Sequence, residues 1–356
     1  NNGNSNDNKE VVKRLVTARL EKAKLLGYDT FANYQLAENM AKNENNAYKL
    51  LDEIWKPALK KAKEELADIN AEIKKEGGNF EAQSWDWRYY VREGAFYVAN
   101  RLFGISFTEL KDIPLPDPDA QAFECKDKDG SHLGILYMDF FTRPGKAGGA
   151  WCGGYRPQAY DKDGKRIAPV VTTVFNFSKP ANGQMALLSA DETETVFHEF
   201  GHALNGLFAD VHYLGVADVP IDFVELPSQI MEHWVFEPEV LNVYAKHYQT
   251  GEVMPKALID KVVKSGKYGQ GFATTEYTAA ALLDLRYHSL KEIPANFNTD
   301  NFEKEVLNKE YGLISQIPPR YRTTYFSHTM GGGYCAGYYS YIWAEVLDAD
   351  AYEAFK

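Results

Sequence analysis

The segment ETVFHEFGHALNGLF contains the pattern H-E-x-x-H at His198, Glu199 and His202. Both imidazoles can reach one metal ion only if residues four apart project from one face, so the pattern requires a helix. Ser189 and Glu192 have capping-box spacing just upstream. Apolar residues then recur every three to four positions, at Val196, Phe200, Ala203 and Leu207. The sequence therefore predicts a helix that presents two zinc ligands, with Glu199 beside the metal as a base for water.

A catalytic zinc needs a third protein ligand and an open position. The segment DFVELPSQIMEHW offers Glu225, with Glu232 and His233 as rivals. From the residues alone, Glu225 and Glu232 are equally good candidates. Pro227 removes one early backbone hydrogen bond, so a helix that begins near Asp222 must kink or start later. Glu232, together with Gln229 on the same face, can instead hydrogen-bond the ligands or lie in solvent.

A second cluster of functional interest is FSHTMGGGYCAGYYSYIW. Its run Gly331–Gly333 forms a loop without side chains, where backbone can approach a ligand closely. Tyr334 and Tyr341 are seven residues apart, which is two helical turns, so we expect them to share a face. Taken singly, such tyrosines are more often part of a core than of a site.

The chain alternates between helical and extended patterns. Helical spacing runs from Val11 to Leu20, from Ala47 to Lys75 with Pro57 inside, and from Trp85 to Leu102. Residues 120–177 have strand character, with Asp-Gly turns at 129–130 and 163–164, and helical patterns resume from residue 191. We expect a mainly α protein with a small antiparallel β-sheet (α+β).

These patterns divide the chain into a polar tail (1–8), a helical segment (9–118) and a zinc catalytic region (119–356) that contains the sheet and the motif helix. The strand VVTTVFNF ends at Phe175–Phe177, which can supply backbone partners to a peptide added at a sheet edge. An ordinary buried strand is an equally good interpretation.

Net charge excludes some classes of function. The 356 residues carry a formal charge of −11, so they lack the basic footprint of a nucleic-acid binder, and an anionic membrane is disfavoured for the same reason. No apolar run is long enough to span a bilayer. Three scattered cysteines favour a reducing compartment over a disulfide framework. We therefore expect a cytoplasmic protein, with a periplasmic or exported one as the alternative because the chain does not begin with Met.

The motifs resemble those of the thimet oligopeptidase family of zinc metallopeptidases, and most closely its bacterial peptidyl-dipeptidase (dipeptidyl carboxypeptidase) branch. The resemblance runs from about residue 9 to the end. It rests on five blocks: HEFGHALNGLF, DFVELPSQIMEHW, LLGYDTFANYQL, SWDWRYY at Ser84–Tyr90, and GKAGGAW at Gly145–Trp151.

The resemblance implies one zinc ion held by His198, His202 and Glu225, since the Glu of the matching block is the third ligand in that family. It implies that Tyr334 and Tyr341 reach towards the scissile carbonyl and that His328 binds substrate nearby. The implied fold is the zincin-like catalytic half of a large helical peptidase. The implied activity is hydrolysis of short peptides, with release of C-terminal dipeptides.

Two other readings of the function remain. The first is an oligopeptidase that cleaves internal bonds; an exopeptidase needs a cation for the terminal carboxylate, and Arg320 or Arg322 can provide it. The second is an inactive fragment that binds zinc or peptide. The chain resembles only the C-terminal half of a family member, so we expect a missing N-terminal half to complete the channel of a monomeric protein.

Overall fold

The computed structural model describes residues 7–76, 88–179, 188–213, 215–247, 251–265 and 269–355. The chain forms two compact units, each assembled from separate stretches. Unit 1 consists of Asn1–Phe80, Pro220–Phe223 and Lys264–Val346, and unit 2 consists of Glu81–Val219, Val224–Val263 and Leu347–Lys356. The sequence suggested a division into consecutive segments at residues 8 and 118. The two units are discontinuous in sequence and do not test that division, which stays a prediction.

Helices dominate the described residues. The N-terminal ones are α1 (Lys9–Leu25), α2 (Phe31–Leu36), α3 (Glu44–Glu76) and α4 (Arg88–Phe103). The central ones are α5 (Ala190–Leu207), α6 (Ile221–Val224), α7 (Leu226–Glu232), α8 (Pro238–Tyr244) and α9 (Lys256–Ser265). The last are α10 (Gln270–His288), α11 (Thr299–Lys304), α12 (Ser327–Met330) and α13 (Ser340–Glu353), with a π-helical turn η1 (Glu305–Glu310) and a 3₁₀ turn η2 (Thr323–Tyr325). The predicted helices at 11–20 and 47–75 are confirmed.

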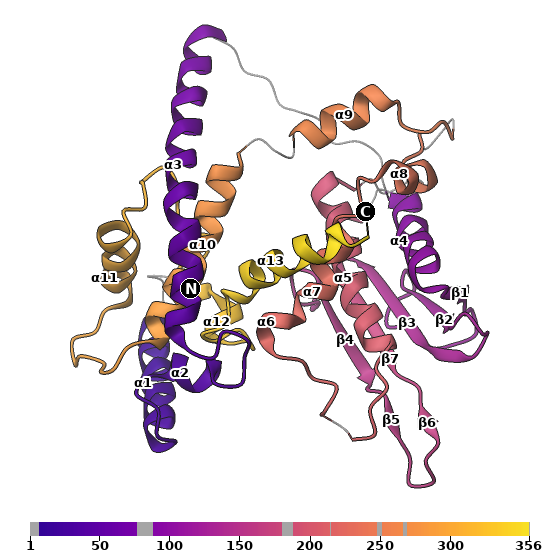
Figure 1. Ribbon diagram of the computed structural model, residues 1–356, viewed down its shortest axis with the longest axis horizontal. Helices are drawn as coiled ribbons and strands as arrows, with labels where there is room; N and C mark the ends of the chain where they lie inside the picture. Colours follow the sequence, from indigo (N-terminus) through magenta and orange to yellow (C-terminus); the bar gives the residue numbers. More distant parts are fainter. Residues whose placement is uncertain are drawn as a thin grey trace. The chain divides into compact units, whose positions relative to one another are not determined.

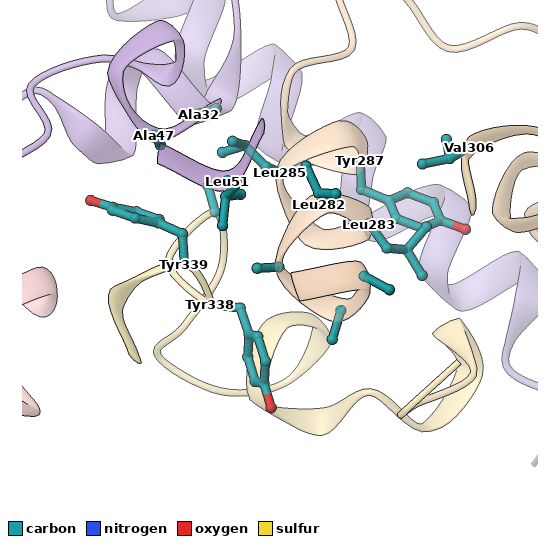
Figure 2. Close-up of a cluster of buried hydrophobic side chains, with 14 of the residues drawn as sticks. Ala32, Ala47, Leu51, Leu282, Leu283, Leu285, Tyr287, Val306, Tyr338 and Tyr339 are labelled. Carbon is teal, nitrogen blue, oxygen red and sulfur yellow. The ribbon is translucent and has the colours of Figure 1, made fainter. Parts of the chain in front are cut away.

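Unit 1 is built around α3 and α10, which pack side by side (Figure 1). Pro57 lies inside α3, where the sequence placed a kink or a helix start. Figure 2 shows the core of this unit, in which α10 contributes a continuous set of small and aliphatic side chains. The labelled members are Ala32, Ala47, Leu51, Leu282, Leu283, Leu285, Tyr287, Val306, Tyr338 and Tyr339.

Unit 2 contains the sheet. Its strands are β1 (Ser106–Glu109), β2 (Gln121–Lys126), β3 (His132–Phe141), β4 (Trp151–Arg156) and β7 (Val170–Phe177), in the order β1-β2-β3-β7-β4. Two short strands, β5 (Ala159–Tyr160) and β6 (Arg166–Ile167), form a separate hairpin. Helix α5 packs across the sheet and is also covered by α4 and α7 (Figure 1). The expected α+β class is confirmed.

The sheet corrects two details of the prediction. It is mixed rather than antiparallel, because β3 and β7 pair in parallel. The chain leaves β3, forms β4 and the β5–β6 hairpin, and returns as β7 between β3 and β4. Strand β7 is therefore interior, and β4 is the edge beside it. The register of β4 on β7 ends at Val174, so β4 does not pair with Phe175–Phe177, and their role towards an added peptide strand stays a prediction.

Within the described residues, no helix combines the length and the apolar composition that crossing a membrane requires. The block SWDWRYY lies largely outside the described residues, which resume at Arg88. The expected helix from Trp85 to Leu102 is observed over its described part as α4.

Candidate metal centre

Helix α5 carries the H-E-x-x-H pattern and begins where the sequence predicts. The hydroxyl Oγ of Ser189 accepts a hydrogen bond from the backbone N–H of Glu192 (3.1 Å), and Glu192 Oε2 accepts one from the backbone N–H of Ser189 (2.8 Å). This capping box satisfies two donors of the first turn, which fixes the start and the phase of the helix. His198 and His202 follow on one face, with ring centroids 5.0 Å apart.

A close approach of backbones brings α7 against α5. A Cβ placed on Gly201 would lie 2.1 Å from the carbonyl oxygen of Pro227 and 2.6 Å from Cα of Ser228. Only glycine allows two helices to approach this closely. Because Gly201 lies between the two histidines in sequence, the contact places the start of α7 beside their side chains.

Glu225 lies at the break between two helical segments. Helix α6 ends at Val224, and α7 begins at Leu226 with Pro227 in its first turn, where a missing N–H costs nothing. The later helix start that Pro227 required is thus observed. The Glu225 side chain is only 1% exposed, and Oγ of Ser228 donates to its Oε2 (2.9 Å).

The two histidines and Glu225 converge. Oε2 of Glu225 lies 3.2 Å from Nε2 of His202 and 3.4 Å from Nε2 of His198. The donor atoms of the three residues all lie within 4.8 Å of one another, and the group is the metal-compatible cluster found among the described residues. Two imidazole nitrogens and one carboxylate oxygen form the donor set of catalytic zinc sites, which leave a fourth position open.

The rivals of Glu225 have other partners. Oε1 of Glu232 lies 2.5 Å from Nδ1 of His198, which is the ring nitrogen that does not face Glu225. The ring of His233 stacks on Tyr352 at 4.4 Å and contacts Asp348 at 3.0 Å. The geometry therefore favours Glu225 over both as the third ligand. Gln229 is buried on α7, which excludes the alternative that it lies in solvent.

Charges within the cluster are strongly coupled. Burial opposes the charged form of His198, but hydrogen bonds with Glu225 and Glu232 outweigh it and raise the pKa of His198 to about 10. Burial also opposes the charge of Glu225, yet hydrogen bonds with His198 and His202 hold the pKa of Glu225 well below its usual range. Within the cluster, the ionised form of the buried Glu225 carboxylate is therefore favoured by the two imidazoles.

Glu199 lies beside this cluster and is 5% exposed. Burial is the largest influence on the Glu199 carboxyl and raises its pKa. Its Oε2 has no hydrogen-bond partner among the residues that the structure describes. Burying such an oxygen is costly unless a ligand satisfies it, so this atom fits a role towards a bound water.

Tyr334, Tyr341 and His328 all lie in unit 1. The rings of Tyr334 and Tyr341 stack with centroids 5.1 Å apart and planes at 10°, and the ring of His328 lies 6.2 Å from Tyr334. The prediction that both tyrosines share a helical face is wrong, because Tyr334 precedes α13 in a turn. The loop geometry, rather than a helix, brings the two rings together.

The two arginines considered for a substrate carboxylate differ in their partners. Arg322 is held by two carboxylates, Glu303 at 2.5 Å and Asp300 at 3.3 Å. Arg320 contacts Glu276 at 3.1 Å and lies over the ring of Tyr277, 5.0 Å from its centroid. Arg320 is therefore the more available of the two.

Sequence reasoning missed several buried carboxylates that hold backbone in place. In unit 1, Asp222 accepts hydrogen bonds from the N–H groups of Met40 (2.9 Å) and Ala41 (2.8 Å) and from the hydroxyl of Tyr339 (2.7 Å). Asp284 binds two N–H groups of the loop after Tyr334. Such roles have no sequence pattern, because the partners are distant in the chain; burial of an aspartate between apolar neighbours is the only signal.

In unit 2, Asp139 near the end of β3 binds side chains instead of backbone. Its carboxylate accepts from Arg143 (2.9 and 2.8 Å) and from Nζ of Lys146 (2.9 Å). Asn176 binds the same loop, donating to the carbonyl of Ala147 (2.6 Å) and of Gly149 (2.7 Å). These bonds order the GKAGGAW block that leads into the edge strand β4.

The fold and this donor set define a mainly α protein with a centre of two histidines and one glutamate. The model of Peptidase family M3 matches residues 1–94 and 91–356. The chain belongs to Peptidase family M3.

Individual proteins with similar sequences are peptidases by name. Dipeptidyl carboxypeptidase of Escherichia coli (strain K12) is 42% identical over 378 residues, which cover 99% of this chain and 55% of that protein. Oligopeptidase A of the same strain is 36% identical over 382 residues, covering 98% and 55%. A solved structure described as an oligoendopeptidase F has a TM-score of 0.56 at 15% identity and covers 97% of this chain and 55% of that one, a likeness that shows the fold alone. The chain spans about half the length of the curated relatives it matches.

Proposed function

We propose that the chain carries the catalytic centre of a zinc-dependent peptidase that releases dipeptides from the C-termini of short peptides. The observation that carries the proposal is the convergence of His198, His202 and Glu225 beside the unsatisfied Oε2 of Glu199. The dipeptidyl carboxypeptidase name of a relative 42% identical to this chain supports the dipeptidyl mode.

The donor set fits one zinc ion, because two neutral imidazoles and a carboxylate are the ligands that this ion prefers in hydrolases. A bound zinc ion supplies Lewis acidity that polarises a carbonyl group and makes water easier to deprotonate. Glu232 contacts His198 through Nδ1, which leaves Nε2 on the side of Glu225, where it would bind the ion. Glu225 is fixed by Ser228 and by burial.

The chain's own residues then handle the proton. Oε2 of Glu199 takes a proton from the attacking water, and the raised pKa of this carboxyl suits it to hold that proton and pass it to the leaving amine. The phenols of Tyr334 and Tyr341 donate hydrogen bonds to the carbonyl oxygen as negative charge develops on it. His328 binds the peptide. The roles of these three residues rest on the family resemblance.

Arg320 is our candidate for binding the free C-terminal carboxylate, since a guanidinium binds a carboxylate through two parallel hydrogen bonds. The Arg320→Gln variant should raise KM for peptides with a free C-terminus and leave KM unchanged for the matching amides. Equal KM changes for both would contradict this assignment. A monomeric state, a cytoplasmic location and completion of a channel by a further N-terminal half remain predictions.

The test of the function combines metal content with turnover. Purified protein should contain one zinc ion per chain, and it should hydrolyse a fluorescence-quenched peptide in a chelator-sensitive manner. Glu199→Gln should retain the metal and lose activity by about 10³-fold or more, whereas Glu239→Gln, which changes an exposed glutamate of unit 2, should behave as wild type. Full activity of Glu199→Gln would remove Glu199 as the base.

A second candidate function, cleavage of internal bonds, is favoured by the similarity to oligopeptidase A. Amidation of the peptide C-terminus separates the two. Dipeptide release should stop with the amide, whereas internal cleavage should continue. An inactive zinc-binding fragment would show metal without turnover on either peptide.

A further inference from the structure

Asp284 is a buried carboxylate that hydrogen-bonds the backbone of the loop after Tyr334. It lies on α10 and is 1% exposed. Its Oδ1 accepts a hydrogen bond from the backbone N–H of Ala336 (3.1 Å), and its Oδ2 accepts one from that of Tyr338 (3.0 Å). Both oxygens are thus used to hold two alternate N–H groups of one turn, which fixes the path of the backbone there.

The turn needs this support because Ala336 has a φ of +56°. An L-residue with a Cβ disfavours this left-handed region, where glycine is at ease. The conformation persists only where the surroundings impose it. The two hydrogen bonds to Asp284 hold Ala336 in this left-handed conformation.

The other end of the segment is held by Arg19 on α1. Its Nη1 donates to the carbonyl of Thr329 (2.8 Å), and its Nη2 donates to that of Met330 (3.4 Å). The same Nη1 lies 2.8 Å from Nε2 of His288. Because Arg19 can only donate, we assign the acceptor role to Nε2 and the ring proton to Nδ1. Nδ1 of His288 then donates to the backbone carbonyl of Asp284 (2.9 Å) and also lies 3.0 Å from Oδ1 of that residue, so Arg19, His288 and Asp284 form one connected set.

Between the residues bound by Arg19 and those bound by Asp284, the backbone forms a closed turn. The N–H of Tyr334 donates to the carbonyl of His328 (3.0 Å). A Cβ on Gly332 would lie 2.8 Å from that same carbonyl oxygen, so this closure requires glycine. The turn therefore has one backbone path, and the ring of Tyr334 leaves it to stack on Tyr341.

We propose that Asp284 is a positioning residue for Tyr334, and that it acts with His288 and Arg19 by fixing the backbone of residues 328–338. The proposal rests on the proposed role of Tyr334. A phenol that stabilises developing charge must be held within a fraction of an ångström of its productive position. A glycine-rich loop does not provide that by itself, whereas a buried carboxylate on a rigid helix does.

The kinetic test uses Asp284→Asn in the zinc-loaded protein. The amide nitrogen of Asn cannot accept, so one of the two loop N–H groups loses its acceptor. We expect kcat to fall about tenfold or more, with KM within about twofold and zinc content unchanged. The same substitution made in a Tyr334→Phe background should cause little further loss of kcat. Asp52→Asn, an exposed aspartate of the same unit, is the matched control and should show wild-type kinetics.

A rescue separates positioning from general damage. Ala336→Gly removes the cost of the left-handed conformation, so in the Asp284→Asn background it should recover part of the lost kcat. An unchanged kcat in Asp284→Asn would overturn the proposal. So would a fold-loss in kcat from Asp284→Asn that is as large in the Tyr334→Phe background as in the wild type.

Amide hydrogen exchange tests the positioning role of Asp284 independently of whether the protein cleaves peptides. In the unaltered protein, the amides of Ala336 and Tyr338 should exchange at least about 100-fold more slowly than an open chain, and Asp284→Asn should accelerate both. Failure of the wild-type chain to cleave peptides would count against the proposed function alone, because the exchange result stands without turnover. Exchange at open-chain rates in the unaltered protein would overturn the positioning role, even if Asp284→Asn does not fold.

Discussion

Glu232 contacts His198 through Nδ1, at 2.5 Å, on the side of the ring opposite to Glu225. A histidine that binds a metal through one nitrogen usually gives its other N–H to a carboxylate, which fixes the tautomer and the orientation of the ring. In the proposed zinc centre, Glu232 would therefore orient His198 without competing with Glu225 for the metal. This separation of roles follows from the position of α7, which presents Glu225 at its start and Glu232 at its end.

We predict that Glu232→Gln weakens zinc binding by about 10–100-fold, because the His198 ring loses its charged partner. Chelator competition would measure the dissociation constant. Glu93→Gln changes an exposed glutamate of the same unit and should leave the constant unchanged. An unaltered constant in Glu232→Gln would show that the ring is oriented by its packing alone.

Gly201→Ala should separate α5 from α7. The added Cβ would meet backbone atoms of Pro227 and Ser228 at 2.1–2.8 Å, and backbone has little room to yield. We expect a loss of about 3 kcal/mol in the free energy of unfolding, together with weaker zinc binding as Glu225 moves. Gly206→Ala on the same helix is the control, since its Cβ would meet only the Val171 side chain, at 3.2 Å. Denaturant unfolding measures both, and equal stability of the two variants would contradict the close-approach argument.

The sequence predicted the motif helix well because its signals are local. The apolar spacing and the Ser189–Glu192 capping box act within a few turns, so they survive in any tertiary context. The choice between Glu225 and Glu232 was open for the opposite reason. Both lie near one face of α7, and the packing of α7 on Gly201 decides which carboxylate meets Nε2 of His198.

Other parts of the fold were missed for physical reasons. The edge strand β4 falls within the stretch 120–177 that has strand character, but Gly153, Gly154 and the lack of an alternating apolar pattern leave its bounds unmarked. The parallel pairing of β3 with β7 joins strands that are separated in sequence by β4 and the β5–β6 hairpin, so no local pattern predicts it. The seven-residue spacing from Tyr334 to Tyr341 suggested a helix, but the left-handed Ala336 interrupts it.

Zinc should stabilise the protein through its three ligands. A ligand at 100 times its dissociation constant adds about 2.7 kcal/mol to the native state, provided that it does not bind the unfolded chain. Differential scanning calorimetry should therefore show a zinc-dependent rise in Tm that a chelator reverses. Glu225→Gln should abolish this rise. A rise of the same size in Glu225→Gln would place the bound zinc somewhere other than the proposed centre.

Asp139→Asn should destabilise unit 2 in a pH-dependent manner. Burial opposes charge on Asp139, but hydrogen bonds from Arg143 and Lys146 outweigh it and lower the pKa of this carboxyl. Its pairing therefore stabilises the fold above the unfolded-state pKa near ~4 and is lost as pH falls through the lower folded-state value. The Lys146 side chain is 4% exposed, and without the carboxylate its charge keeps only neutral partners such as the carbonyls of Asp139 and Phe141, which should cost about 3 kcal/mol at pH 7. Denaturant unfolding at several pH values should show this deficit shrinking below about pH 4, while Asp163→Asn in the exposed β5–β6 turn shows none. A deficit that stays constant down to pH 2 would mean that Asp139 stabilises the fold by packing and not by charge.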